Sequence, residues 1–188
     1  MKAILQFFSV AIAILAVALC NAPSSGRAES EPQVIEGWRG AKWGMGVVDV
    51  LAAFKGEAEK LSEEEGWKDG VCFVKIPKLE LAEELFDANF VFDKEKRLLK
   101  QVVLLASKTV KYPEETFGPL EQKLTEKYGK PDFSSNEITG AKNTIITKKC
   151  SWKKGKTRIE LQFFEIKEVI KRLTVTYEET PEKGDKNL

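Results

Sequence analysis

The sequence LFDANFVFDKEKRLLKQVVLLAS, residues 85–107, has the pattern of a β-hairpin. Between Phe86 and Phe92, aromatic residues and alanine occupy every second position, with Asp87 and Asn89 among the residues between them. A polar turn follows at 93–96, and a second apolar run covers 97–107. Alternation on both sides of a short polar turn is typical of two antiparallel strands. We therefore expect an antiparallel sheet built around this hairpin.

The flanking sequence adds further elements to this sheet. Helices are predicted from Val47 to Phe54 and from Tyr112 to Tyr128, where Pro119 would delay the regular helix until Gly118. Four more strands are predicted, at 71–76, 144–153, 156–166 and 169–178, and a short strand and turn at 35–44. Residues 57–70 are predicted to form a loop or a frayed helical extension. The expected fold class is α+β, with a six-stranded antiparallel sheet and two helices on one face.

The order of elements occurs twice along the chain. A helix that ends in an aromatic residue and glycine precedes three strands, first at Phe54 to Gly56 and again at Tyr128 to Gly129. The sequence therefore allows a tandem αβββ repeat, and chance recurrence of a common pattern is the alternative. The expected domain covers 35–179, between a flexible leader at 29–34 and a disordered tail at 180–188.

The N-terminal segment has the layout of a secretory signal peptide. Residues 3–19 carry no charge, the following residues break the apolar run, and Ala28 offers a small residue for cleavage. We expect residues 1–28 to be removed and the domain to be exported, to the periplasm or the medium. A retained anchor is the alternative, although the uncharged run of residues 3–19 is short of the roughly 20 apolar residues that cross a bilayer.

Composition limits the chemistry that this chain can perform. The sequence contains no histidine, which removes imidazole-dependent triads, most zinc sites and the usual proton shuttle near neutral pH. The carboxylates show no spacing that isolates a catalytic pair, and no glycine-rich phosphate loop is present. We therefore expect no enzyme, no cofactor and no metal. With 30 Lys and Arg against 29 Asp and Glu, nucleic acid is not an expected partner.

Two cysteines lie within the expected domain, Cys72 and Cys150. Each falls on the first strand of its set, so a pseudo-twofold that placed these strands side by side would bring the thiols together. Because export to an oxidising compartment favours pairing, we expect a disulfide between them. Separate burial of two thiols is the alternative.

Three features suggest a partner surface. Trp38, beside Arg39, has the residue type of an interface hot spot, and packing into the core is the alternative. The hairpin 142–158 carries seven cations and no acid, among them Lys149, Lys153 and Lys154, which suits an anionic partner or a solvated sheet edge. Finally, one strand is apolar on both sides, so an uncovered sheet face would present Leu99, Val103, Leu105 and Phe164.

The segment WGMGVVDVLAAF, residues 43–54, resembles the opening helix of small exported α+β modules, including the outer-membrane assembly lipoprotein family and β-lactamase-inhibitor-like proteins. The segment LTEKYGKP, residues 124–131, is similar to the end of such a helix. The resemblance implies a non-catalytic envelope module or an inhibitor-like binding module. Members of the lipoprotein family attach lipid to a cysteine, but Leu19 precedes Cys20 here where a small residue is usual.

From these observations we expect an exported, non-catalytic binding module of the bacterial cell envelope. It would bind a protein or another envelope component through its sheet face and basic hairpin, with anionic lipid or polysaccharide as further options. The alternative function is a periplasmic carrier of a lipid or other apolar ligand, held between the sheet and the helices.

Overall fold

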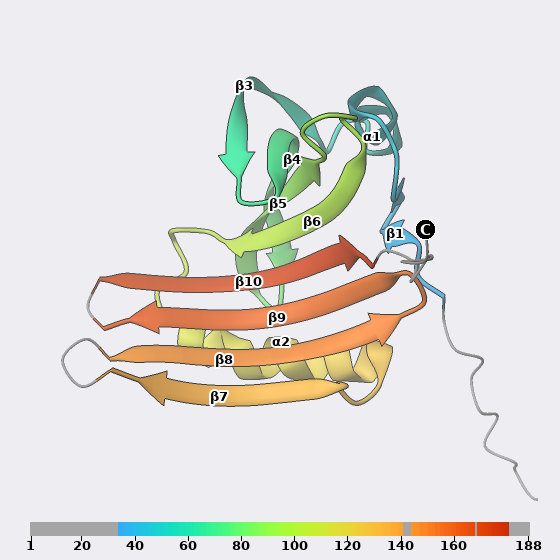
Figure 1. Ribbon diagram of the computed structural model, residues 1–188. Coiled ribbons are helices and arrows are strands. Elements are labelled where there is room, and N and C mark those ends of the chain that lie inside the picture. Colours follow the sequence, from blue (N-terminus) through green and yellow to red (C-terminus); the bar gives the residue numbers. More distant parts are fainter. Residues whose placement is uncertain (1–33, 141–143, 168, 181–188) are drawn as a thin grey trace, which may run out of the picture. The chain divides into compact units, whose positions relative to one another are not determined.

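The computed structural model describes residues 34–140, 144–167 and 169–180 (Figure 1). The expected signal peptide, Cys20 and nearly all of the expected tail lie outside the described residues. The elements in chain order are β1 (Gly37–Trp38), β2 (Ala41–Lys42), α1 (Val47–Ala53), β3 (Glu59–Trp67), β4 (Gly70–Leu81), β5 (Glu84–Phe92), β6 (Leu99–Ala106), α2 (Pro113–Tyr128), β7 (Phe133–Thr139), β8 (Ile145–Lys154), β9 (Thr157–Ile166) and β10 (Ile170–Glu179).

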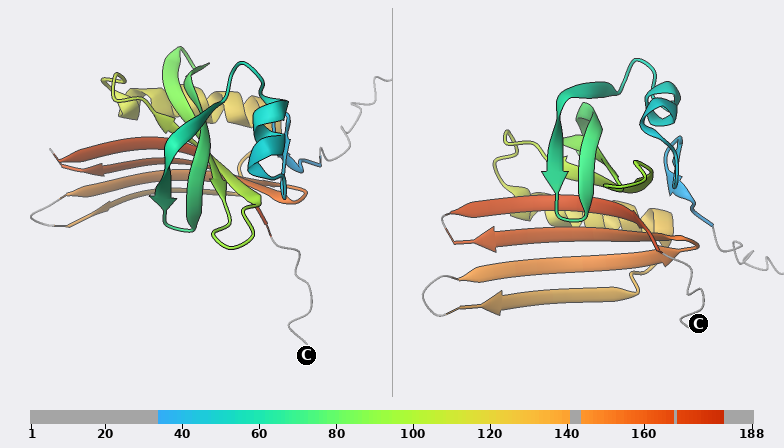
Figure 2. Two further views of the ribbon diagram at one scale, coloured as in Figure 1. Left: turned by 90° about the horizontal axis from the view of Figure 1, so that it is seen from above. Right: turned by 45° about the horizontal axis from the view of Figure 1, so that its top comes forward.

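The fold is α+β, with two helices, an eight-stranded antiparallel sheet and a small separate hairpin, β1–β2. The strand order in the large sheet is β3-β4-β5-β6-β10-β9-β8-β7. Each helix therefore precedes a four-stranded meander, and the two meanders meet where β6 pairs with β10. Figures 1 and 2 show that the first meander stands steeply across the direction of the second. The expected hairpin at 85–107 is confirmed as β5 and β6.

The expectation of six strands was wrong because it missed both edge strands, β3 and β7. Their side chains are almost all exposed or half-buried, so neither strand shows the apolar alternation that marks a sheet with one covered face. In addition, β4 continues beyond Pro77 to Leu81, with a register shift against β5 between Ile76 and Leu79. The shift absorbs the proline, which cannot donate a ladder hydrogen bond.

One apolar core joins the helices to both meanders. From α2, the buried side chains of Phe117, Leu120 and Leu124 belong to the same cluster as those of β8, β9 and β10. From the N-terminal part, Trp38 and Phe54 surround Phe90 of β5, with ring centroids 5.2 to 5.9 Å apart. Full burial of one such side chain contributes about 1.5–3 kcal/mol. The core therefore holds the two meanders together.

The N-terminal hairpin is fixed to the far meander by polar contacts. The indole Nε1 of Trp43 donates to Thr157 Oγ1 at 2.9 Å, and that hydroxyl donates to the backbone oxygen of Ile35 at 2.6 Å. Thr157 is fully buried, so this pair satisfies groups that would otherwise be costly to bury. Trp43 therefore has the structural role that its position beside the core suggests.

Helix α2 begins at Pro113 and runs through Pro119 without ending, so the expected late start at Gly118 was wrong. Proline is well placed at the start, where a backbone N–H has no intrahelical partner. At position 119 it leaves the carbonyl oxygen of Glu115 without its usual donor. The buried stripe of the helix against the sheet outweighs this local cost.

The expected disulfide between Cys72 and Cys150 was wrong: both thiols are free and buried. The first lies on β4 and the second on β8, and β5, β6, β10 and β9 lie between them in the sheet. The last strands of the two meanders, β6 and β10, meet in the middle of the sheet, and the strands that carry the cysteines lie away from that junction. Disulfide formation requires Cα atoms within about 7 Å, so non-adjacent strands of one sheet cannot satisfy it.

Candidate functional site

Two residues of the expected partner surface belong to the core instead. Trp38 and Leu99 are buried and are part of the main apolar cluster. Trp38 packs against Phe54, Phe90 and Tyr177. Neither side chain is available to a partner, so the expectation was wrong for both.

Val103 and Leu105 point to the opposite face of the sheet, which carries no helix, but the chain itself covers much of this part. Val103 is buried, and Leu105 is half-buried. A pocket of about 390 Å³ is lined by Leu105 and Arg172 together with Trp67 and Lys68 at the β3–β4 turn. The steep angle of the first meander therefore brings its end over β6 and β10. This part of the expected open face is therefore partly covered.

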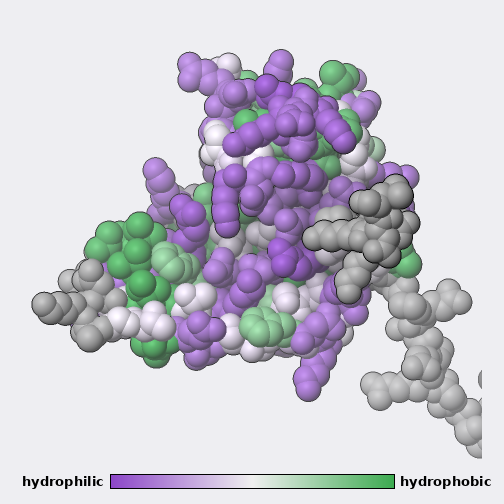
Figure 3. Space-filling view, viewed as in Figure 1, coloured by the Kyte–Doolittle hydropathy of each residue, from purple (hydrophilic) through white to green (hydrophobic). Residues whose placement is uncertain are grey.

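The same face remains open farther along the second meander. There Phe164 and Ile166 of β9 lie in register with Thr147 and Ile145 of β8, and all four side chains are half-buried. Val169 and Ile170, at the same end of the strands, are 74% and 45% exposed, whereas Ile138 of β7 pairs with Ile146 and points to the helix-side face. We call Ile145, Ile166, Val169 and Ile170 the apolar end. It is the hydrophobic patch at one end of the second meander in Figure 3.

Acids of neighbouring strands neutralise part of the expected basic hairpin. Lys149 Nζ lies 2.9 Å from Glu160 Oε2, and Arg158 pairs with Glu178 at 2.5 Å. Lys153 is exposed, and Lys154 is half-buried. The acids come from β9 and β10, which the ladder places beside the hairpin. An inspection of the hairpin sequence alone could not reveal these partners.

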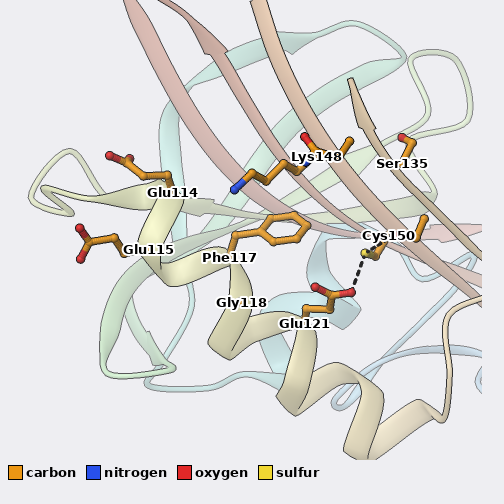
Figure 4. Close-up of a pocket in the computed structure, with 10 residues that line it drawn as sticks. Glu114, Glu115, Phe117, Gly118, Glu121, Ser135, Lys148 and Cys150 are labelled. Atoms are coloured by element: carbon orange, nitrogen blue, oxygen red, sulfur yellow. Dashed lines mark hydrogen bonds between the residues drawn. The ribbon is translucent and has the colours of Figure 1, made fainter. Parts of the chain in front are cut away.

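A cleft of about 410 Å³ lies between α2 and the strands β7 and β8 (Figure 4). Helix α2 contributes Glu114, Glu115, Phe117, Gly118 and Glu121, while the strands contribute Ser134, Ser135, Asn136, Lys148 and Cys150. The cleft exists because α2 packs mainly on β9 and β10, which leaves the helix-side face of β7 uncovered. Its lining is mostly polar.

The thiol of Cys150 is held at the wall of this cleft. Its Sγ donates to Glu121 Oε1 at 3.2 Å and lies 3.4 Å from Ser134 Oγ. Burial raises the pKa of Cys150, and the neighbouring Glu121 carboxylate raises it further, against a lowering by Ser134. A raised pKa disfavours the thiolate, which is the nucleophilic form. The arrangement therefore suits a structural thiol rather than a catalytic one.

At the other end of the cleft, Glu114 forms an ion pair with Lys171 at 2.9 Å. Burial alone would raise the pKa of Glu114, but the hydrogen bond from Lys171 and the positive charges nearby lower it. The same contact raises the pKa of Lys171. The second oxygen of Glu114, Oε2, is buried and has no hydrogen-bond partner among the described residues. The Glu114 carboxylate therefore stays ionised at neutral pH, with its charge balanced by Lys171.

Lys148 supplies the only cation that lines the cleft within the described part of the chain. Its Nζ lies 6.0 Å from the ring centroids of both Phe117 and Phe163. Sequence reasoning missed this site because it did not recognise β7. A signal was present in α2, where Glu114, Gly118 and Glu121 share one helix face at the spacing of one and two turns.

No protein-family model, curated protein or solved structure matches this chain. Within the described residues, no three His, Cys, Asp or Glu side chains come together as a metal site would require. Neither helix in the described ranges is long and apolar enough to span a bilayer. The function must therefore be argued from the surfaces themselves.

Proposed function

We propose that this chain is an exported, non-catalytic binding module of the bacterial cell envelope. Its partner surface would be the helix-free face of β8, β9 and β10, with the apolar end as the principal contact. The observation that carries the proposal is the exposure of Val169 and Ile170 beside the half-buried Ile145 and Ile166. Clustered exposed aliphatic side chains commonly mark interaction sites.

The partner that fits this surface best is a protein. Two cations near the apolar end, Lys149 and Lys171, are matched by acids of neighbouring strands, Glu160 and Glu165. An apolar centre with a charge-balanced rim is the usual anatomy of a protein interface. An anionic membrane would instead favour an excess of unpaired cations.

The alternative function, a carrier of a lipid, has less support. The space between the sheet and the helices is filled by the side chains of the core, including Trp152, Phe163 and Leu120. The cleft beside α2 is open and lined by three glutamates, which do not suit an apolar ligand.

We also propose that the two halves form a tandem repeat of a helix and four strands, in place of the expected helix and three strands. The support is the matching order of elements and the meeting of the last strands, β6 and β10. In this view the first half completes the core and the second half provides the partner surface.

Site-specific photo-crosslinking in the producing cell tests the binding function. A photoreactive amino acid at Phe164 or Ile170 should give one discrete adduct, and the same group at the exposed turn residue Lys94 should not. Changing Ile145 and Ile166 to threonine should remove the adduct without unfolding the domain. Adducts of equal yield from all three positions, or none from Phe164 and Ile170, would contradict the proposal.

A further inference from the structure

We propose that the edge of β7 and the cleft beside α2 together bind an extended, basic polypeptide segment, which adds to the sheet as a further strand. This site is distinct from the helix-free face of the proposed function, so the two proposals are tested independently. Strand addition of this kind uses the unpaired backbone groups of a sheet edge for affinity and neighbouring pockets for selectivity.

The edge of β7 is suited to this role. It pairs with β8 on one side, from Phe133 to Thr139, without any register shift, and it is the last strand of the sheet. In an antiparallel ladder, every second residue of an edge strand turns its N–H and C=O away from its neighbour. The strand contains no proline, lysine or bulge, and Glu137 is its one charged residue. Proline, charged residues such as lysine, and bulges are the features that proteins commonly use to block such edges, and β7 has only one of them, Glu137.

The position of α2 gives the added strand a wall on one side. The helix lies under β8 to β10, so alternate side chains of a strand added to β7 would point toward the cleft, which Glu115, Gly118 and Glu121 line on the helix side. In Figure 4 the side chain of Glu121 points toward Cys150 of β8, whereas the side chains of Glu114 and Glu115 lie at the other end of the cleft and point away from the strands.

Gly118 leaves open space in the cleft that a side chain of the bound strand could occupy. It lies within α2, where glycine costs about 1 kcal/mol relative to alanine. A Cβ atom built at this position would have no neighbour within 4 Å. No close packing within the described chain therefore requires glycine here, whereas a side chain from a bound strand could use the space.

The carboxylates that line the cleft favour basic side chains on the added strand. Three carboxylates line the cleft against one lysine, and Glu114 already pairs with Lys171. Within the described residues, Glu115 and Glu121 form no ion pair. Lysine or arginine side chains at alternate positions would meet these two carboxylates, whereas acidic side chains would be repelled.

Peptide binding tests the inference directly. The blocked peptide acetyl-KTKTKTKT-amide, followed by fluorescence anisotropy, should bind at least about tenfold more tightly than acetyl-ETETETET-amide. Two further versions carry N-methyl groups on either the odd or the even amides. One version should lose binding and the other should keep it, because only one set of amides would face β7.

Two matched variants locate the site. Glu115→Lys with Glu121→Gln should weaken the lysine peptide about tenfold, while Glu63→Lys with Glu65→Gln makes the same charge change on β3 and should leave the affinity unchanged. Circular dichroism confirms that each variant folds. The inference is overturned by equal affinity for the two peptides, by no binding of either, by retention of binding in both N-methylated versions, or by an equal effect of the β3 variant.

Discussion

The two edges of the sheet differ in the way they are protected. Strand β3 carries five charged residues, and its pairing with β4 shifts register between Lys60 and Glu65. Its acids are also engaged, with Glu64 Oε2 3.0 Å from Arg97 and Glu59 Oε1 3.5 Å from Lys75. Strand β7 has an unbroken register and one charge. Charge and bulges are the usual means of blocking edge pairing, so the contrast indicates that one edge is closed and the other is kept available.

This comparison assumes that both edges belong to one cooperatively folding unit. Phe90 of β5 and Trp152 of β8 are both fully buried in the shared core. Changing either to alanine should lower the free energy of unfolding by about 3–5 kcal/mol, from lost burial and the cavity left behind. Urea denaturation followed by circular dichroism should show a single transition in each variant. Two separate transitions would mean that the halves, and their edges, fold independently.

The cost of glycine in α2 provides a second test. Gly118→Ala should stabilise the free protein by up to about 1 kcal/mol, because alanine favours the helix and the added methyl group meets no atom. Gly129 is the matched control, since its φ of 80° after the end of α2 is unfavourable for a residue with a side chain. Gly129→Ala should destabilise the protein by about 1 kcal/mol. Thermal and urea denaturation measure both effects.

If Gly118→Ala destabilised the protein instead, that glycine would serve packing inside the chain. The open space at Gly118 would then give no support for a bound side chain. If Gly118→Ala left stability unchanged but abolished peptide binding, the added methyl group would have filled space in the cleft that the peptide needs. That result would sharpen the contrast between the two edges.

Self-association distinguishes the two edges without any ligand. Glu137→Val on β7 should make the protein aggregate sooner on warming, because it removes the one charge from a regular edge. Glu63→Val on β3 should have little effect, since the register shift and the remaining charges still block pairing. Light scattering at matched concentration measures the difference. Equal aggregation of the two variants would remove the contrast between the edges.

The smallest expected effect concerns the ion pair at the mouth of the cleft. Glu114→Gln should cost less than about 1 kcal/mol at neutral pH, since the pair with Lys171 is partly exposed. The pKa of Glu114 is lowered in the folded state, so its contribution is present above the ordinary value of 4.5. It is lost as the pH falls through the lowered folded pKa. The stability difference between variant and parent should therefore disappear in acid, and a constant difference would contradict it.

The sequence predicted the interior of the sheet better than its borders. Strands such as β5 have one buried face, so Phe86, Ala88 and Phe90 appear at alternate positions. Strands β3 and β7 have little buried surface, and their polar sequences resemble loops. The missed strands are the edges, and one of them forms the candidate site.

The remaining wrong predictions concern contacts that depend on the tertiary arrangement of the chain. Trp38 was assigned to a surface because an aromatic residue beside glycine and arginine fits both roles, and only the packing of Phe54, Phe90 and Tyr177 distinguishes them. The cysteine pairing depended on which strands meet at the centre of the sheet. The neutralising partner of Lys149 comes from β9 and is visible only once the strands are in register.

Amide hydrogen exchange in the presence of acetyl-KTKTKTKT-amide tests the contrast between the edges most directly. The account predicts new protection at every second amide between Phe133 and Thr139, with no change between Glu59 and Trp67. Protection that appears on β3, or binding that protects no amide of β7, would contradict it.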